Sequence, residues 1–247
     1  MIRLSNICKS FNDQVVLDQL NLTVEPEKIT VIIGQSGCGK SVLLKHMIAL
    51  IRPDSGQVIV DGEDITSLDE KGLNQTRKKF GMLFQDAALF DSMTVGDNVA
   101  FPLREHTRLS EKDIEEVVFE KLKLVGLTES FHKMPSELSG GMRKRVGLAR
   151  AIALDPKIIL FDEPTTGLDP IMKDAIDGLI MKTQELTQAT CVVISHDIDS
   201  AFKIANKLAM LSDGRIVESG TPEEFQASKN PVVVNFIKGH AETNNQN

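Results

Sequence analysis

Residues 34–41 read Gly-Gln-Ser-Gly-Cys-Gly-Lys-Ser, and this stretch decides the fold. It matches the pattern G-x-x-x-x-G-K-[ST], with an apolar run at 29–33 before it and apolar residues at helical spacing after it. The glycines allow several backbone N–H groups to face phosphate oxygens, and the N-terminus of the following helix favours an anion. An ordinary glycine-rich turn is the alternative, but the strand, turn and helix in this order predict a nucleotide phosphate site.

The turn also supplies two side chains suited to a metal-bound nucleotide. Lys40 would reach the β- and γ-phosphates, and the hydroxyl of Ser41 would hold Mg²⁺. Val42 stands where many such loops carry a second hydroxyl, so only its backbone N–H remains for phosphate. The residues expected to contact ATP here are Gly34, Gln35, Ser36, Gly37, Cys38, Gly39, Lys40, Ser41 and Val42.

Two carboxylates follow the apolar run at 158–161. Adjacent strand residues point to opposite faces, so Asp162 and Glu163 should have different roles. Asp162 would bind Mg²⁺, and Glu163 would polarise the water that attacks the γ-phosphate. Two acids after a strand are otherwise common as solvated turn residues, and the phosphate-binding turn in the same chain favours the catalytic interpretation.

Apolar periodicity along the chain predicts strands that alternate with helices, which is typical of parallel βαβ units in an α/β fold. Ser110 is expected to cap a helix that has Asp113 at its third position. The polar tail, 240–247, is predicted to be disordered. Expected strands cover 2–4, 15–17, 20–24, 29–33, 58–60, 158–161, 191–194, 208–211 and 215–217, and expected helices start at 40, 110, 140, 171 and 197.

Composition narrows the class of protein. The 247 residues are 41% hydrophobic and 26% charged, with a net charge of −7, which argues against nonspecific binding to nucleic acid. No apolar run approaches the roughly 18 residues of a membrane span, and the three cysteines stand far apart. We expect a cytoplasmic chain with reduced cysteines that acts on a membrane only through a partner.

Between the phosphate-binding turn and the acidic strand end, the sequence contains Leu138, Ser139, Gly140 and Gly141, followed by Met142. With this signature, the sequence resembles the ATP-binding-cassette (ABC) ATPases over about residues 2–220. The resemblance implies an α/β ABC nucleotide-binding domain over 1–239: a P-loop core, an antiparallel β part, and a helical subdomain at about 87–155.

The resemblance also assigns roles to isolated residues. Phe11 would stack on adenine, Gln85 would link to Mg²⁺ and the γ-phosphate, Asp169 would belong to the D-loop, and His196 would be the switch histidine. Glu163, His196 and Lys40 would then be the catalytic residues. The signature residues Leu138 to Gly141 would act in trans, because in this family two chains pair head to tail around ATP.

Met142 and the residue sequences of 80–103 and 196–216 are most similar to those of the ATPases of Mla-type, MCE-linked phospholipid transport systems. That resemblance implies a homodimer at the cytoplasmic face of a bacterial inner membrane. It further implies an integral permease, an MCE-domain lipid-binding protein and a small cytoplasmic subunit as partners, with ATP and Mg²⁺ as cofactors and no nucleic acid.

Three other functions remain open from the residues. The chain could energise import of a small solute such as an amino acid or an ion, because the motor motifs do not identify cargo. A soluble ABC ATPase acting on DNA or ribosomes is disfavoured by the short interval from Lys40 to Leu138 and by the charge of −7. A nucleotide-binding regulator without turnover is disfavoured by the presence of Glu163 and His196.

Two further segments have alternative interpretations. Residues 87–95 are apolar and lie beyond Gln85, so they are either core or part of a groove that receives a helix of the permease. The basic clusters 77–79 and 143–145 are either solvated helix faces or contacts with an acidic partner or lipid headgroups.

Overall fold

The computed structural model describes the backbone of residues 1–244 and the side chains of residues 1–239. The chain forms two compact units, which are described separately. The first unit contains Met1–Arg77 and the chain from Thr190 onward, and the second unit is Lys78–Ala189. The prediction of one domain over 1–239 stays a prediction.

The first unit contains an antiparallel sheet in the order β2-β1-β4-β5. Along β1, Ile2 and Leu4 are buried while Arg3 is exposed, the alternation expected of a strand with one solvated face. The predicted runs at 15–17 and 20–24 belong to one continuous strand. The strands are β1 (Ile2–Phe11), β2 (Gln14–Val24), β4 (Ser55–Val60) and β5 (Glu63–Asp64).

The same unit contains strands in the order β10-β9-β3-β8, with β3 parallel to both β8 and β9. Every residue of β3 and β8 is buried, as in parallel strands that are covered on both faces. β10 pairs antiparallel with β9. The bounds are β3 (Ile29–Ile33), β8 (Thr190–Ser195), β9 (Lys207–Ser212) and β10 (Arg215–Gly220).

The helices of the first unit include two that the sequence predicts and three that it does not. α1 and α7 follow β3 and β8, as the βαβ pattern requires. The tail predicted to be disordered overlaps α9, which runs to Asn244, and residues 245–247 lie outside the described residues. The helices are α1 (Lys40–Met47), α2 (Glu70–Arg77), α7 (Ile198–Ile204), α8 (Pro222–Gln226) and α9 (Pro231–Asn244).

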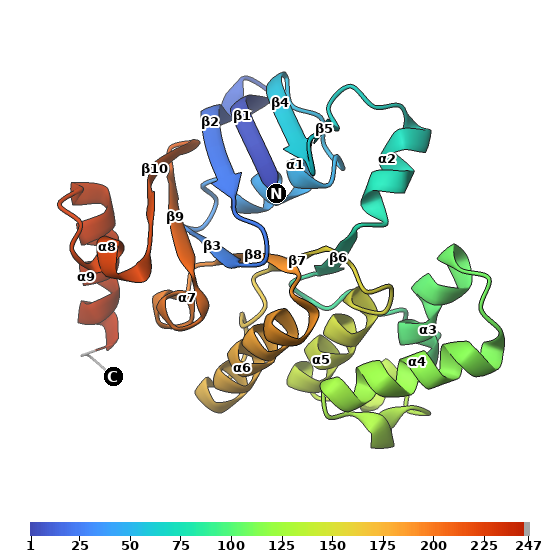
Figure 1. Ribbon diagram of the computed structural model, residues 1–247. Helices are drawn as coiled ribbons and strands as arrows, with labels where there is room; N and C mark the ends of the chain where they lie inside the picture. The colour runs from blue at the N-terminus through green and yellow to red at the C-terminus, as the bar shows by residue number, and fades with distance from the viewer. Residues whose placement is uncertain (245–247) are drawn as a thin grey trace. The chain divides into compact units, whose positions relative to one another are not determined.

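The second unit pairs two parallel strands and carries four α-helices, of which α3, α4 and α5 pack on one another (Figure 1). These three helices fall inside the segment predicted as a helical subdomain. The elements are β6 (Phe80–Leu83), α3 (Val95–His106), α4 (Glu111–Leu124), the short 3₁₀ turns Thr128–Ser130 and Pro135–Glu137, α5 (Gly140–Ala151), β7 (Ile158–Asp162) and α6 (Pro170–Thr187).

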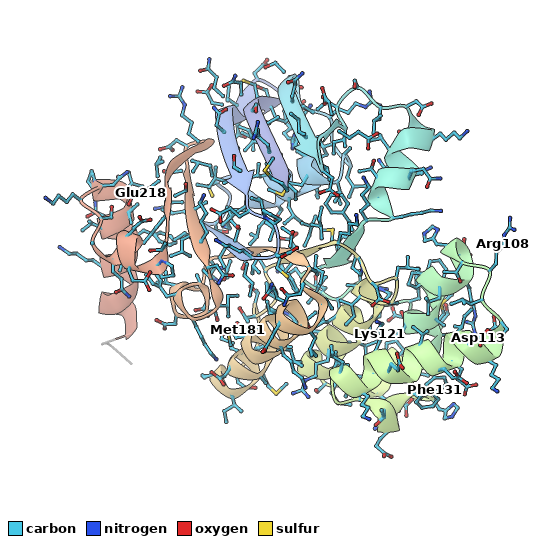
Figure 2. All side chains as sticks on the ribbon, in the orientation of Figure 1. Arg108, Asp113, Lys121, Phe131, Met181 and Glu218 are labelled. Atoms are coloured by element: carbon cyan, nitrogen blue, oxygen red, sulfur yellow. The ribbon has the colours of Figure 1, made fainter. Side chains whose placement is uncertain are left out.

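Local signals set the start of α4. The Ser110 side chain accepts from the Asp113 N–H at 3.2 Å, and the Asp113 carboxylate accepts from the Ser110 N–H, so the predicted cap is confirmed as a capping box. Figure 2 shows Asp113 at this end and Lys121 further along the helix. Lys121 forms an ion pair with Asp155, which ties the helix to the loop before β7.

Within residues 1–244, no helix has both the length and the apolar character needed to cross a membrane.

Candidate functional site

The phosphate-binding turn joins β3 to α1, where the sequence predicts it. Gly39 has a φ of +103° and immediately precedes α1. A Cβ at Gly39 would lie 3.1 Å from the Val16 carbonyl oxygen, and a Cβ at Gly34 would overlap the Leu211 carbonyl. Neighbouring main chain therefore excludes a side chain at Gly34, and at Gly39 a side chain would be crowded by Val16 and strained by the positive φ.

Lys40 is the first residue of α1, and its side chain folds back over the turn. Its ammonium donates to the carbonyl oxygens of Gly34 at 2.9 Å and Gln35 at 3.0 Å. The residue is 6% exposed. These bonds hold a buried positive charge at the turn, beside the helix N-terminus that attracts an anion.

One wall of a pocket in the first unit comes from the turn, through Gln35 and Cys38. Asp213, between β9 and β10, and Phe236 of α9 contribute to the other walls. Burial raises the pKa of the Cys38 thiol, so this cysteine stays protonated near neutral pH. The end of β9, the Asp213 turn and α9 thus line this pocket together with the phosphate-binding turn.

Phe11 and His196 also belong to the first unit. Phe11 ends β1 with its ring 43% exposed, and the Lys9 ammonium lies 5.4 Å from the ring centroid. Such a ring is accessible for stacking. His196 is exposed and directly follows β8, between buried Ser195 and α7.

The predicted acids lie in the second unit at the end of β7. Asp162 is the last residue of the strand, and Glu163 begins a turn in which the Thr166 N–H donates to the Glu163 carbonyl at 3.2 Å. Glu163 has a φ of +51°, a left-handed conformation that is costly for a residue with a Cβ. The Thr166 hydroxyl donates to Glu163 Oε2 at 2.9 Å and so orients the carboxylate. Strain of this kind is typical of functional sites.

The same turn is held from α5 by a contact that sequence reasoning missed. The Lys144 ammonium donates to the carbonyls of Pro164 and Thr166, both at 2.7 Å, and to that of Glu163 at 3.4 Å. The cluster 143–145 is therefore not simply a solvated helix face or a surface for an acidic partner. A basic residue at this position gives no sequence signal of burial.

The signature residues form the start of α5. Ser139 is the N-cap, and its hydroxyl accepts from the Met142 N–H at 3.3 Å. The Arg143 guanidinium donates to the Leu138 carbonyl at 2.7 Å, which fixes the approach to the helix. Gly140 at the first helical position is exposed, whereas Gly141 is buried against the Met172 side chain, which leaves no room for a Cβ there. Asp169 caps α6 in the same way, accepting from the Met172 N–H at 3.0 Å.

The apolar segment beyond Gln85 divides between core and surface. Ala87 and Val95 are buried, whereas Phe90 is 41% exposed. Gln85 itself is exposed. The segment is thus neither wholly core nor wholly a free surface.

Arg150 of α5 forms hydrogen bonds with the main chain of this segment. Its guanidinium donates to the carbonyls of Ala87 and Ala88, both at 2.7 Å, and lies 5.8 Å from the Phe90 ring centroid. Ala87 and Ala88 have φ values of +61° and +47°, so the guanidinium holds two residues in left-handed conformations.

The structure brings the predicted residues together in two sets. Within the first unit, the turn 34–42 is built on the same strands that lead to His196. Within the second unit, α5 links the signature, the Glu163 turn and the segment after Gln85. Among residues 1–239, no group of three or more His, Cys, Asp or Glu is arranged to hold a metal ion.

Comparison with known proteins identifies the class. The sequence profile of the family described as ABC transporter matches residues 17–166, and the chain belongs to this family. It is an ATP-binding cassette with the α/β fold of that family, and it is an ATPase.

Two relatives and one solved cassette illustrate the similarity. The chain is 45% identical to the Haemophilus influenzae "Intermembrane phospholipid transport system ATP-binding protein MlaF", over 98% of this chain and 92% of that protein. It is also 45% identical to the Mycobacterium tuberculosis "Probable ribonucleotide transport ATP-binding protein mkl", over 96% of this chain and 66% of that protein. MJ0796, a bacterial ABC transporter cassette of dimeric structure, superposes with a TM-score of 0.83 at 33% identity, covering 90% of this chain and 99% of that one. MJ0796 also has a dimeric post-hydrolysis structure bound to ADP and Pi.

Proposed function

We propose that this chain is the ATP-hydrolysing subunit of a system that moves phospholipid between the inner and outer membranes through a separate permease. The observation that carries this cargo is the 45% identity that extends over 98% of the chain and 92% of the Haemophilus influenzae MlaF protein. The mkl protein is equally identical but extends well beyond the aligned region, so a ribonucleotide is the second candidate cargo. A small solute is the alternative that the motor residues leave open.

The first unit supplies the adenine-binding and phosphate-binding residues of the nucleotide site that we propose. Phe11 stacks on adenine, the turn from Gly34 to Val42 surrounds the phosphates, and Lys40 moves its ammonium from the turn carbonyls toward the β- and γ-phosphates. The position of the Lys40 ammonium on the turn carbonyls, beside the helix N-terminus, supports this role.

Magnesium fits the donors that are present. Ser41 offers a hydroxyl, Gln85 an amide oxygen and Asp162 a single carboxylate, without a cluster of three or more metal-binding residues within 1–239. Mg²⁺ in nucleotide sites takes one or two protein oxygens and fills the remaining positions with phosphate oxygens and water. When bound, it supplies positive charge to the β- and γ-phosphate oxygens.

Glu163 is proposed to orient and polarise the attacking water. The Thr166 hydroxyl donates to one oxygen of this carboxylate and so orients it, and a carboxylate is a suitable group to accept a proton from water. His196 would contact the γ-phosphate next to the attacking water. Ser139 and the first turn of α5 would present N–H groups to the same phosphate from a second chain, with Asp169 at the junction.

This arrangement requires a homodimer. The dimeric MJ0796 structures support it, since that cassette is similar over almost its whole length. By the same similarity, the chain would lie peripherally on the inner membrane, bound to an integral permease. An MCE-domain lipid-binding protein and a small cytoplasmic subunit would complete the complex.

The catalytic assignment is tested with Glu163→Gln. Glutamine keeps an acceptor for the Thr166 hydroxyl, so the fold and ATP binding should stay normal while the charge that activates water is lost. We expect hydrolysis to fall by about 10²–10⁴-fold and an ATP-bound dimer to accumulate. Glu185→Gln, an exposed neutralisation in α6 of the same unit, is the matched control. Steady-state hydrolysis near the wild-type rate in Glu163→Gln would sink the assignment.

The cargo is tested on the native membrane complex. The complex is purified through this chain, its bound small molecules are analysed by mass spectrometry, and ATPase rates are measured with added phospholipid vesicles or ribonucleotides. Bound phospholipid and lipid-stimulated hydrolysis are expected. Ribonucleotide binding and stimulation without any lipid effect would replace the first cargo by the second.

A further inference from the structure

The Lys144 side chain crosses from the helix that begins at the signature to the turn that carries Glu163. Lys144 lies in α5 and is 6% exposed. All three of its hydrogen bonds go to main-chain carbonyls of one turn: Pro164 and Thr166 at 2.7 Å and Glu163 at 3.4 Å. A single ammonium therefore gathers the carbonyl oxygens of the loop between β7 and α6.

A buried ammonium is costly unless its donors are satisfied, and here the three donors match three acceptors. Burial lowers the pKa of the Lys144 ammonium, and the carboxylates of Asp86 and Glu163 oppose that shift. Converging carbonyl dipoles would repel one another without a cation among them. The turn and the lysine therefore stabilise each other.

The turn that Lys144 holds determines where the Glu163 carboxylate points. Glu163 is left-handed at +51°, and its carboxylate is bonded to the Thr166 hydroxyl at 2.9 Å. The Thr166 carbonyl is one of the oxygens bonded to Lys144. The side chain of Thr166 thus fixes the carboxylate, while its main chain is fixed by α5.

We propose that Lys144 is a positioning residue for ATP hydrolysis. Through its hydrogen bonds to the 163–166 turn, it fixes the position of the Glu163 carboxylate relative to the helix that begins at the signature. The proposal rests on the proposed role of Glu163. A shift of α5 on binding a phosphate at Ser139 would be carried through Lys144 to the carboxylate, so that contact at the signature and activation of water change together.

The experiment uses the purified full chain with Lys144→Met, which keeps length but removes the donors, and Lys144→Gln, which keeps two neutral N–H donors. The control is Lys123→Met, an exposed lysine at the end of α4 in the same unit. Measured are thermal unfolding, ATP affinity, kcat and KM. We expect Lys144→Met to lower kcat by about 10–100-fold while KM and ATP affinity change less than about twofold, because a small displacement of the general base affects chemistry and not binding. Lys144→Gln should recover part of the loss.

A double variant separates positioning from general damage. In the Glu163→Gln background, adding Lys144→Met should lower the residual rate by less than about twofold, because Lys144 acts through the carboxylate that is already gone. An equal loss in both backgrounds would overturn the proposal, as would a folded Lys144→Met protein with wild-type kcat. If both lysine variants lose cooperative unfolding, the role is structural only, and the proposal is again overturned. Failure of the catalytic assignment itself is read separately, from the Glu163→Gln single variant.

Discussion

The half-buried Arg150 guanidinium leads to a prediction about how much its two hydrogen bonds contribute to stability. Replacing it by methionine keeps much of the apolar length but removes the bonds to the Ala87 and Ala88 carbonyls. Ala88 is exposed, so its carbonyl regains water and the loss is about 1 kcal/mol, whereas Ala87 is buried and its unpaired carbonyl costs about 1–3 kcal/mol. Methionine retains contact with the Phe90 ring, so that term changes little.

The sum is about 2–4 kcal/mol, which corresponds to a fall in Tm of roughly 5–15 °C for a chain of this size. The assay is thermal unfolding together with hydrogen exchange. Amides of the segment 84–93, including the Phe90 N–H that bonds Asn98 Oδ1 at 2.8 Å, should exchange faster, and those of α4 should not change.

Arg104→Met is the matched control. Arg104 forms ion pairs with Asp97 at 2.9 Å and Glu111 at 2.8 Å, but its side chain is 42% exposed. Exposed pairs contribute about 0–1 kcal/mol, so this loss should be smaller although the Arg104 guanidinium makes four hydrogen bonds and that of Arg150 makes two. A Tm loss in Arg104→Met equal to that in Arg150→Met would refute the argument from burial, and so would unchanged exchange in 84–93.

Three further predictions concern assembly, docking and pH. A mixed dimer of Lys40→Ala and Ser139→Arg chains keeps one intact composite site, so mixing should partly restore the ATPase rate that each homodimer lacks; full activity of the Ser139→Arg homodimer would contradict this. Phe90→Glu should abolish co-purification with the permease while Tm and ATP affinity stay near normal, because a charged group is costly to desolvate at an apolar contact; a folded variant that still holds the permease places docking elsewhere. The Thr94 hydroxyl and a neighbouring guanidinium lower the pKa of Asp97, so its contribution is present above the unfolded value and is lost as pH falls through the lower folded value. In Asp97→Asn, stability should therefore fall less steeply below about pH 4 than it does in the wild type. The measurement is the urea midpoint as a function of pH, and the same pH dependence in both proteins would count against this assignment.

Elements with a strong local pattern could be predicted in place. The strand 29–33, the following glycine turn and the start of α1 at Lys40 are confirmed, as is the capping box of α4 at Ser110. By contrast, α3 was not predicted, because Pro102 inside it is a local signal for a break. In the folded chain, the Asn98 side chain donates to three carbonyls near the start of this helix and holds it.

The sequence by itself determined the chemistry: which residues can surround a phosphate, which carboxylates end a buried strand, and which glycines begin a signature helix. These are local properties of spacing and residue type. Only the tertiary structure decided what Lys144 and Arg150 do, since each looks like an ordinary surface cation in the sequence. Their acceptors lie 20 and 63 positions away along the chain, at Pro164 and Ala87. Each cation is stabilised because the fold brings carbonyl oxygens to it, and a local sequence pattern does not show contacts between residues so far apart.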